Sequence, residues 1–284
     1  MECPGATLIG VPFGEPDYRF LCQKVEQRFR IKLSDYKPEQ MSRRIATLAK
    51  QLGCPSFAAY VGLLERDQIA LTQFFDLMTI NVTEFFRNSS LFEELIGKIL
   101  PLIPSPAPGE TFAAWSAGCS NGAEAFTVAM LLQEAFGDKP FRIKGTDIDL
   151  TMIAKASSPS FTAAELSGVS ASRLDRFFSS PDEKSYVPKI QLRRNVHFAR
   201  HDLLADPYPP QEYDLILCRN VVIYFNDDAK ERIYEGFYKA LKPGGVLFVG
   251  GTERIATAPR IGFELIRPFF YSKPAASAGL KRAA

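Results

Sequence analysis

The stretch Trp115-Ser-Ala-Gly118-Cys-Ser-Asn-Gly122-Ala-Glu124 decides the fold of this chain. The run that leads into it, residues 110–117, is strand-like, and residues 122–136 have the apolar spacing of a helix. A strand, a glycine turn and a helix in this order are typical of an open α/β sheet that binds a nucleotide-like ligand. Glycines let the backbone approach a ligand, and a helix start offers unpaired N–H groups. The stretch predicts where a ligand binds, although two glycines can also serve only to shape a loop.

The chain after this stretch alternates between strand-like and helix-like runs. We expect strands at 110–117, 141–147, 213–218 and 246–250, helices at 122–136, 150–156 and 227–241, and a terminal hairpin at 263–267 and 269–273. Such alternation favours a mostly parallel, doubly wound sheet. The segment 159–195 is rich in serine, proline and charge and breaks the alternation, so we interpret it as an inserted subdomain.

The first third of the chain has a different pattern. Residues 17–100 show only helical spacing, and the segment 101–109 that follows has four prolines in nine residues. Proline-rich segments of this kind act as stiff, non-helical connectors. We therefore predict an N-terminal all-helical domain (1–100), a linker (101–109) and an α/β domain (110–284).

Composition restricts the class of protein. The chain has 284 residues, of which 46% are hydrophobic and 23% charged, as in globular proteins. No apolar run reaches the roughly 18 residues of a membrane helix, and the N-terminus lacks the features of a signal peptide. Five scattered cysteines suit a reducing compartment. We expect a cytoplasmic protein without membrane insertion and, because no heptad pattern stands out, a monomer.

Basic residues are concentrated near the N-terminus. Residues 17–66 contain ten lysines and arginines but five acids, whereas the net charge of the whole chain is +2. A basic region of this kind suggests an acidic partner, which could be a carboxylate-rich protein, nucleic acid or a lipid surface. A solvated helix face would give the same count.

The two histidines do not predict a metal site. His197 and His201 have a spacing that binds metal on a helix, but the residues around them form a strand-like run. On a strand this spacing keeps the two rings well apart along one face. We expect no metal.

Three polar clusters follow the expected strands: residues 118–124, the pair Asp147 and Asp149, and the pair Arg219 and Asn220. Ligands of open α/β sheets bind beyond the carboxyl ends of the strands, and an acid after the second strand typically binds ribose hydroxyls. NAD and S-adenosylmethionine both carry a ribose. The phosphate-binding G-x-G-x-x-G is absent, and Glu124 at a helix start would repel a pyrophosphate. This favours the sulfonium of S-adenosylmethionine.

Four blocks of sequence together resemble the CheR-type chemotaxis receptor methyltransferases. They are Asn81-Val-Thr83-Glu-Phe-Phe-Arg87-Asn, the stretch 115–124, Gly145-Thr-Asp147-Ile-Asp149, and Cys218-Arg219-Asn220-Val-Val-Ile-Tyr224-Phe followed by Leu241-Lys-Pro-Gly-Gly. The blocks occur in the family's order and approximate spacing, and the resemblance extends from about residue 17 to residue 273. It implies a Rossmann-like S-adenosylmethionine methyltransferase sheet preceded by a helical substrate-recognition domain.

The resemblance implies an activity and a partner. The family transfers methyl groups from S-adenosylmethionine to glutamate side chains on cytoplasmic helices of chemoreceptors. The products are glutamate methyl esters and S-adenosylhomocysteine. The methyl esters serve sensory adaptation in signal transduction. No nucleic acid partner is implied.

Residue roles are also carried over from the resemblance. It implies that Asn81, Thr83 and Arg87 reach into the cofactor pocket, where Arg87 pairs with the cofactor carboxylate. Tyr224 would stand beside the transferred methyl, so Arg87 and Tyr224 are the implied catalytic positions. The remaining implied cofactor contacts are Glu124, Asp147, Asp202, Leu203, Arg219 and Asn220. Asp202 stands where the family often has Asn.

Receptor docking is assigned by the resemblance to a basic helix, here Arg43, Arg44 and Lys50. Thr47, Leu48 and Ala49 occupy positions where further basic residues are expected. Some relatives bind a receptor C-terminal peptide through a glycine-containing loop in the inserted subdomain. The corresponding residues 178–185 are short and lack glycine, so we expect an enzyme that works without this peptide.

Two other functions stay open. One is an S-adenosylmethionine-dependent methyltransferase with another acceptor, such as nucleic acid, although no Asn-Pro-Pro-Tyr-like motif follows the strand at 214–218. The other is a non-catalytic S-adenosylmethionine-binding signalling module, because Ala123 and Ala125 stand where relatives often have Glu and Pro. An NAD-dependent oxidoreductase is the least favoured.

Overall fold

The computed structural model describes residues 12–78, 83–182 and 184–275 of the chain. It divides into two compact units. The first comprises Met1–Ile80 together with Tyr224–Ala229, and the second comprises Asn81–Ile223 and Lys230–Ala284. No helix in the described part of the chain is long and apolar enough to span a membrane.

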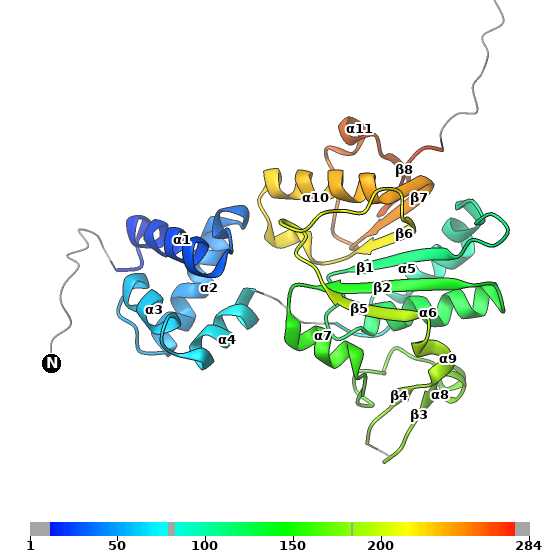
Figure 1. The fold of residues 1–284 in the computed structure, drawn as a ribbon, viewed down its shortest axis with the longest axis horizontal. Coiled ribbons are helices and arrows are strands. Elements are labelled where there is room, and N and C mark those ends of the chain that lie inside the picture. The colour runs from blue at the N-terminus through cyan, green and yellow to red at the C-terminus, as the bar shows by residue number, and fades with distance from the viewer. Residues whose placement is uncertain (1–11, 79–82, 183, 276–284) are drawn as a thin grey trace, which may run out of the picture. The chain divides into compact units, whose positions relative to one another are not determined.

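The first unit is helical (Figure 1). It contains α1 (Glu15–Phe29), the 3-10 turn η1 (Leu33–Asp35), α2 (Pro38–Gln51), α3 (Phe57–Leu64) and α4 (Gln68–Met78). Its core consists of apolar side chains that recur at helical spacing, such as Leu21, Ile45 and Phe74, each with 0% of its surface exposed. The helical N-terminal domain expected from the sequence is therefore confirmed.

A buried acid organises the packing of α1 on α3. Asp17, near the start of α1, accepts hydrogen bonds from the backbone N–H groups of Phe57 (2.8 Å) and Ala58 (3.2 Å). These N–H groups belong to the first turn of α3 and have no partner within that helix. A carboxylate is favoured at this position because it also meets the positive end of the helix dipole.

The segment Tyr224–Ala229 joins the helical unit through its backbone. Lys37 N–H donates to the carbonyl oxygen of Tyr224 at 3.0 Å, and Asn226 N–H donates to that of Asp35 at 2.9 Å. The rings of Tyr36 and Phe225 lie with centroids 4.9 Å apart. The residues between η1 and α2 therefore hold the backbone at Tyr224 in place.

The second unit is built on a seven-stranded sheet in the order β5-β2-β1-β6-β7-β9-β8. The strands are β1 (Phe112–Ala117), β2 (Phe141–Asp147), β5 (Val196–Arg200), β6 (Tyr213–Cys218), β7 (Leu241–Val249), β8 (Glu264–Arg267) and β9 (Phe270–Ser272). Neighbours from β5 to β7 pair in parallel, and β9 pairs antiparallel with both β7 and β8. The predicted mostly parallel, doubly wound sheet is confirmed, including the terminal hairpin. Figure 1 shows this strand order from β5 to β7.

Both faces of the central strands are buried. In β1, Phe112 and Ala114 belong to a core shared with α6 (Ala123–Phe136), whereas Trp115 packs on Phe237 of α10 (Asp227–Ala240), with ring centroids 5.4 Å apart. This alternation follows from the period of two in a strand. It explains the near-continuous apolar sequence of β1 and β6.

Residues 83–109 pack within the second unit. Helix α5 (Ser89–Glu94) continues into a π-helical turn, η2 (Leu95–Ile99), and a 3-10 turn, η3 (Leu100–Leu102). Phe92 contacts Phe248 of β7 with ring centroids 5.7 Å apart, and Leu95 and Ile99 are buried in the same core. Along the chain, the first unit therefore gives way to the second at Asn81, ahead of the proline-rich segment 101–109, because the apolar face of this helix packs on the sheet.

The segment 159–195 forms α8 (Ala171–Phe177), the two-stranded sheet of β3 (Phe178–Ser179) and β4 (Val187–Pro188), and α9 (Ile190–Arg193). It lies beyond β5 and below α6 in Figure 1. The remaining helices are α7 (Leu150–Ser157), α11 (Ala258–Ile261) and the short turn η4 (Val222–Tyr224). One strand is longer than expected, because β7 begins at Leu241 and not at Val246. Its pairing with β6 changes register between Tyr213 and Leu215. The segment Lys242-Pro-Gly-Gly is therefore an irregular part of the strand.

Candidate functional site

The glycine loop after β1 requires glycine at two positions. Gly118 has φ +82° and Gly122 has φ +90°, which side chains rarely adopt. A Cβ on Gly118 would lie 2.3 Å from Cγ2 of Val221, and one on Gly122 would lie 2.9 Å from the ring of Phe198. The glycines therefore shape the loop and also admit side chains from the segments after β6 and in β5.

Asp147, at the end of β2, fastens this loop. Its Oδ2 accepts the N–H of Ser120 at 2.8 Å, and its Oδ1 accepts the N–H of Asp149 at 3.0 Å. Burial raises the pKa of the Asp147 carboxyl, although these two N–H donors act in the opposite direction. Asp149 itself caps α7 by accepting the N–H groups of Thr151 and Met152.

Arg219 directly follows β6 and is almost fully enclosed, with 2% of its side chain exposed. Its Nη1 lies 3.4 Å from Oε2 of Glu124, in the first turn of α6. Its Nη2 donates to the carbonyl oxygen of Arg87 at 2.7 Å and to Oδ1 of Asn88 at 3.1 Å. The fold thus joins predicted site residues from three separate blocks of sequence around one guanidinium.

Burial dominates the electrostatics of this ion pair. The rings of Phe92 and Phe248 each lie 4.8 Å from the Arg219 guanidinium carbon. Glu124 also accepts a hydrogen bond from Ser116 Oγ at 2.8 Å. Even so, the pKa of Glu124 is raised and that of Arg219 is lowered, in both cases chiefly by burial. Loss of hydration therefore outweighs the mutual attraction for both partners.

Asn220 takes a left-handed backbone conformation with φ +61°. Its N–H donates a short hydrogen bond to Oε1 of Glu253, which lies beyond the end of β7. Three buried polar atoms at this corner have no hydrogen-bond partner among the described residues: Arg219 Nε, Asn220 Oδ1 and Glu253 Oε2. Buried polar atoms are usually paired, so the corner suits a polar ligand with both donors and acceptors.

The predicted residues upstream of the sheet are only partly visible. Asn81 lies outside the described residues. Thr83 and Arg87 are both half-buried. The Arg87 charge acts on both Glu124 and Arg219, lowering the pKa of each, so its guanidinium is near the enclosed pair.

Asp202 and Leu203 follow β5, on the other side of β2 from the glycine loop. Asp202 Oδ1 accepts the N–H of Leu204 at 2.9 Å, and the Leu203 carbonyl accepts the Tyr208 hydroxyl at 2.8 Å. Next to them His201 is buried, with its ring 5.2 Å from that of Trp115. Burial lowers the pKa of His201, so the imidazole is favoured in its neutral form.

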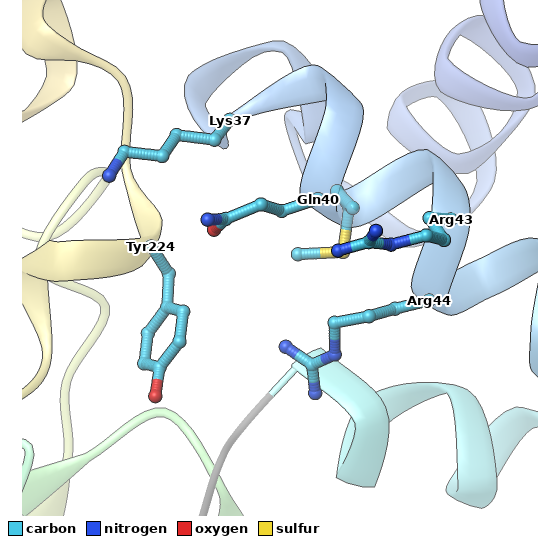
Figure 2. Close-up of a pocket in the computed structure, with 6 residues that line it drawn as sticks. Lys37, Gln40, Arg43, Arg44 and Tyr224 are labelled. Carbon is cyan, nitrogen blue, oxygen red and sulfur yellow. The ribbon is translucent and has the colours of Figure 1, made fainter.

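A separate pocket lies in the helical unit. It has a volume of about 150 Å³ and is lined by Lys37, Gln40, Met41, Arg43, Arg44 and Tyr224. Figure 2 shows Lys37, Gln40, Arg43 and Arg44 extending from the α2 region toward the space beside the Tyr224 ring. Arg44 also donates a short hydrogen bond to the carbonyl oxygen of Leu77. Two of the three predicted docking residues therefore share a pocket with the predicted catalytic tyrosine.

Lys50 does not line this pocket. Its Nζ lies 4.9 Å from the centre of the Phe13 ring.

Comparison with known proteins decides the family. Residues 16–79 match the all-alpha domain of CheR methyltransferases, and residues 81–266 match the CheR methyltransferase SAM binding domain. The chain belongs to the CheR methyltransferase family. It is 33% identical over 264 residues to the chemotaxis protein methyltransferase of Listeria monocytogenes, covering 93% of this chain and 99% of that protein.

Two enterobacterial relatives show the same extent of similarity. The chemotaxis protein methyltransferase of Escherichia coli is 34% identical over 254 residues, which cover 86% of each chain. That of Salmonella typhimurium is 33% identical over 254 residues, which cover 86% of this chain and 85% of the relative. The likeness therefore includes both units of the structure.

The geometry fits the cofactor of the CheR family. The glycine loop lacks a phosphate-binding motif, and the carboxylate of Glu124 stands in the first turn of α6, where it suits a cationic ligand. The unpaired atoms of Arg219, Asn220 and Glu253 offer one donor and two acceptors. An amino acid moiety, with an ammonium and a carboxylate, is the complementary chemistry.

Sequence reasoning missed some residues of these sites. Asp147 ends a buried strand and Glu253 comes four residues after one, so the search for acids at strand ends that found Asp147 could also have found Glu253. Ser116 and Phe92 gave no signal, because only the fold places them against Glu124 and Arg219. Lys37 was counted in the basic region, but its place beside Tyr224 depends on tertiary contacts.

Proposed function

We propose that this CheR methyltransferase uses the Glu124–Arg219 cluster to bind S-adenosylmethionine and the pocket at Tyr224 to receive a receptor glutamate. Its activity is the transfer of a methyl group to chemoreceptor glutamates, giving glutamate methyl esters for sensory adaptation. The observation that supports the cofactor site most directly is the enclosed Arg219, whose own Nε is unpaired, as are Oδ1 of Asn220 and Oε2 of Glu253. S-adenosylmethionine supplies an activated methyl on its sulfonium.

The cofactor residues have distinct proposed roles. Arg87 pairs with the cofactor carboxylate, a match for a guanidinium fork, and Asn81 and Thr83 support it from the same segment. Glu124 and Asp147 contact the polar and ribose groups. The other proposed contacts are Asp202, Leu203, Arg219 and Asn220.

The reaction needs no strong base. A glutamate carboxylate is ionised near pH 7, so it is already a nucleophile. The protein contributes alignment of the carboxylate with the methyl and exclusion of water. We propose that Tyr224 stands beside the transferred methyl, with its backbone fastened by the Lys37 N–H.

Docking is proposed to depend on charge. Lys37, Arg43 and Arg44 meet around one pocket, and receptor helices that carry methylatable glutamates are acidic. Lys50 would act at the periphery, since it does not line the pocket. We further propose a monomer that works in the cytoplasm and, because residues 178–185 are short and lack glycine, does not need a receptor C-terminal peptide.

The first test is calorimetric titration with S-adenosylmethionine, S-adenosylhomocysteine and NAD, followed by labelled methyl transfer to receptor cytoplasmic fragments. We expect micromolar binding of both sulfur ligands, none of NAD, and label on receptor glutamates. In Arg87→Ala, cofactor affinity should fall by about 1.5–3 kcal/mol, the scale of a charged hydrogen bond. An unchanged dissociation constant would remove Arg87 from the cofactor site.

The same assays separate the alternatives. Cofactor binding without transfer to any receptor fragment would favour a non-catalytic signalling module. Label on another acceptor would assign a different substrate to the same cofactor site.

A further inference from the structure

Glu253 contributes an unpaired carboxyl oxygen to the corner of the cofactor site, and its other oxygen connects the ends of two strands. It follows β7 by four residues, and its own N–H closes a turn onto the carbonyl oxygen of Gly250 at 2.8 Å. Its Oε1 accepts the N–H of Asn220, which follows β6. The side chain is 5% exposed, so this contact is made away from solvent.

The hydrogen bond from Asn220 to Glu253 stabilises an unfavourable backbone conformation at Asn220. Asn220 has φ +61°, a conformation that non-glycine residues adopt at a cost. The corner is also closely packed, because a Cβ on Gly250 would lie 2.7 Å from Glu253 Oε1 and 3.0 Å from Asn220 N. Glu253 thus fixes the direction in which the chain leaves Arg219.

Opposing charges act on Glu253. The groups that interact electrostatically with it are Arg219 and Cys218 at the end of β6, Glu124 on α6 and Tyr234 on α10. The guanidinium of Arg219 favours the ionised form of Glu253, whereas the carboxylate of Glu124 disfavours it. Burial raises the pKa of Glu253 to about 7, opposed by hydrogen bonds from the N–H groups of Asn220 and Gly250. The carboxyl therefore keeps its proton to a higher pH than an exposed glutamate does.

We propose that Glu253 is a positioning residue that holds the Arg219–Asn220 corner of the cofactor site and releases a proton when the cationic cofactor binds. The inference rests on the proposed cofactor site. The carboxylic O–H bond breaks, the proton passes to the buffer, and the carboxylate continues to accept the Asn220 N–H. A ligand cation near Glu124 and Glu253 attracts the carboxylate of Glu253 and so favours its ionised form.

Comparison of S-adenosylmethionine with S-adenosylhomocysteine distinguishes the effect of ligand charge from that of ligand shape. S-adenosylmethionine carries a sulfonium, whereas S-adenosylhomocysteine has a neutral thioether and otherwise the same groups. Proton release should therefore accompany the first ligand much more than the second.

The test is calorimetric titration at pH 7 in two buffers of different ionisation enthalpy. We expect the wild-type enzyme to release more protons with S-adenosylmethionine than with S-adenosylhomocysteine. Glu253→Gln keeps an acceptor oxygen but cannot titrate, so this difference should vanish while affinity for S-adenosylhomocysteine stays within about threefold. Glu264→Gln, an exposed acid on β8, is the matched control and should behave as wild type.

A second variant tests the positioning role. Glu253→Ala removes the acceptor for Asn220 and should weaken S-adenosylhomocysteine binding at least tenfold relative to Glu253→Gln, on the scale of about 1.4 kcal/mol for each factor of ten. Equal proton release in wild type and Glu253→Gln, or equal affinity in the Ala and Gln variants, overturns the inference alone. Absence of binding to wild type overturns the cofactor site and the inference together.

Discussion

Arg219 and Glu124 show that a buried ion pair need not be present for stability. Burial shifts the pKa of each group toward its neutral form in spite of the partner at 3.4 Å. Such pairs add little to folding, because lost hydration offsets the attraction. We interpret the pair as charges prepared for a ligand, since a bound zwitterion can contact both.

Glu253 gives a prediction about stability and pH. Its pKa in the folded protein is raised from 4.5 to about 7, so the folded state favours the protonated form. The free energy of unfolding that this group contributes is fully present below pH 4.5 and is lost as the pH rises through about 7, by up to about 3 kcal/mol. The free energy of unfolding of Glu253→Gln, minus that of wild type, should therefore rise by about 2 kcal/mol from pH 5.5 to pH 8. Urea unfolding of the unliganded proteins measures this difference. A constant difference between the two proteins across this range would contradict the prediction.

Tyr224 is predicted to act in turnover and not in cofactor binding. Tyr224 lines the pocket together with Lys37 and Arg44, so loss of its hydroxyl should affect the step at the acceptor (Figure 2). Tyr224→Phe should lower kcat by up to about tenfold, the scale of one lost hydrogen bond. The dissociation constant of S-adenosylhomocysteine should stay unchanged in calorimetry. Tyr186→Phe, in the inserted subdomain, is the control. Parallel loss of affinity and melting temperature in Tyr224→Phe would indicate a structural tyrosine.

At the scale of elements, the turn between β1 and α6 is predicted to tolerate no side chain at Gly118. Gly118→Ala places a Cβ 2.3 Å from Val221 at a positive φ, so we expect a loss of about 1–3 kcal/mol in urea unfolding and weaker cofactor binding. Gly97→Ala is the matched control, because no atom lies within 4 Å of its added Cβ. That variant should unfold at the same urea concentration as wild type or slightly higher. Equal stability of the two variants would show that the loop relaxes around Gly118→Ala.

Helix α2 is predicted to carry the electrostatic part of receptor binding. Arg43→Glu reverses a charge at the pocket and should raise the KM for a receptor fragment by about tenfold, an effect that added salt reduces. Cofactor affinity should not change. Lys24→Glu makes the same change of charge on α1, outside the pocket, and should have a much smaller effect. Equal changes in KM for both variants would show that only the net charge matters.

At the scale of the whole molecule, the α/β unit is predicted to need residues 81–109. This segment buries Phe85, Phe92, Leu95 and Ile99 in the core of the sheet. Burial of each of these side chains stabilises the fold by about 1.5–3 kcal/mol. Domains are typically stable by only about 5–15 kcal/mol. Removal of the whole segment, with its other buried residues, should therefore cost more than the domain's stability. A fragment of residues 110–284 should show no cooperative thermal unfolding, whereas 81–284 should unfold cooperatively and bind S-adenosylhomocysteine. Cooperative unfolding of the shorter fragment would support the boundary suggested by the proline-rich segment.

Local sequence patterns were enough to predict the class of fold and the edge of the sheet where the site lies. Alternation of buried strands with helices is a local pattern, and the carboxyl ends of parallel strands lie at one edge, so Asp147, Arg219 and the glycine loop could be placed together. The family blocks likewise follow from the order of residues along the chain.

Only the tertiary structure decided which partners these residues have. Arg87 and Arg219 are separated by 132 residues, and Asn220 and Glu253 by 33, so no local pattern connects them. The helix at 89–94 has an apolar face that helical spacing reveals, but spacing does not say which neighbour buries it. Long-range packing against β7 settles that question, and it also encloses the charges of the site. The positions of the polar residues are thus local information, whereas their burial, and therefore their pKa values, depend on the whole fold.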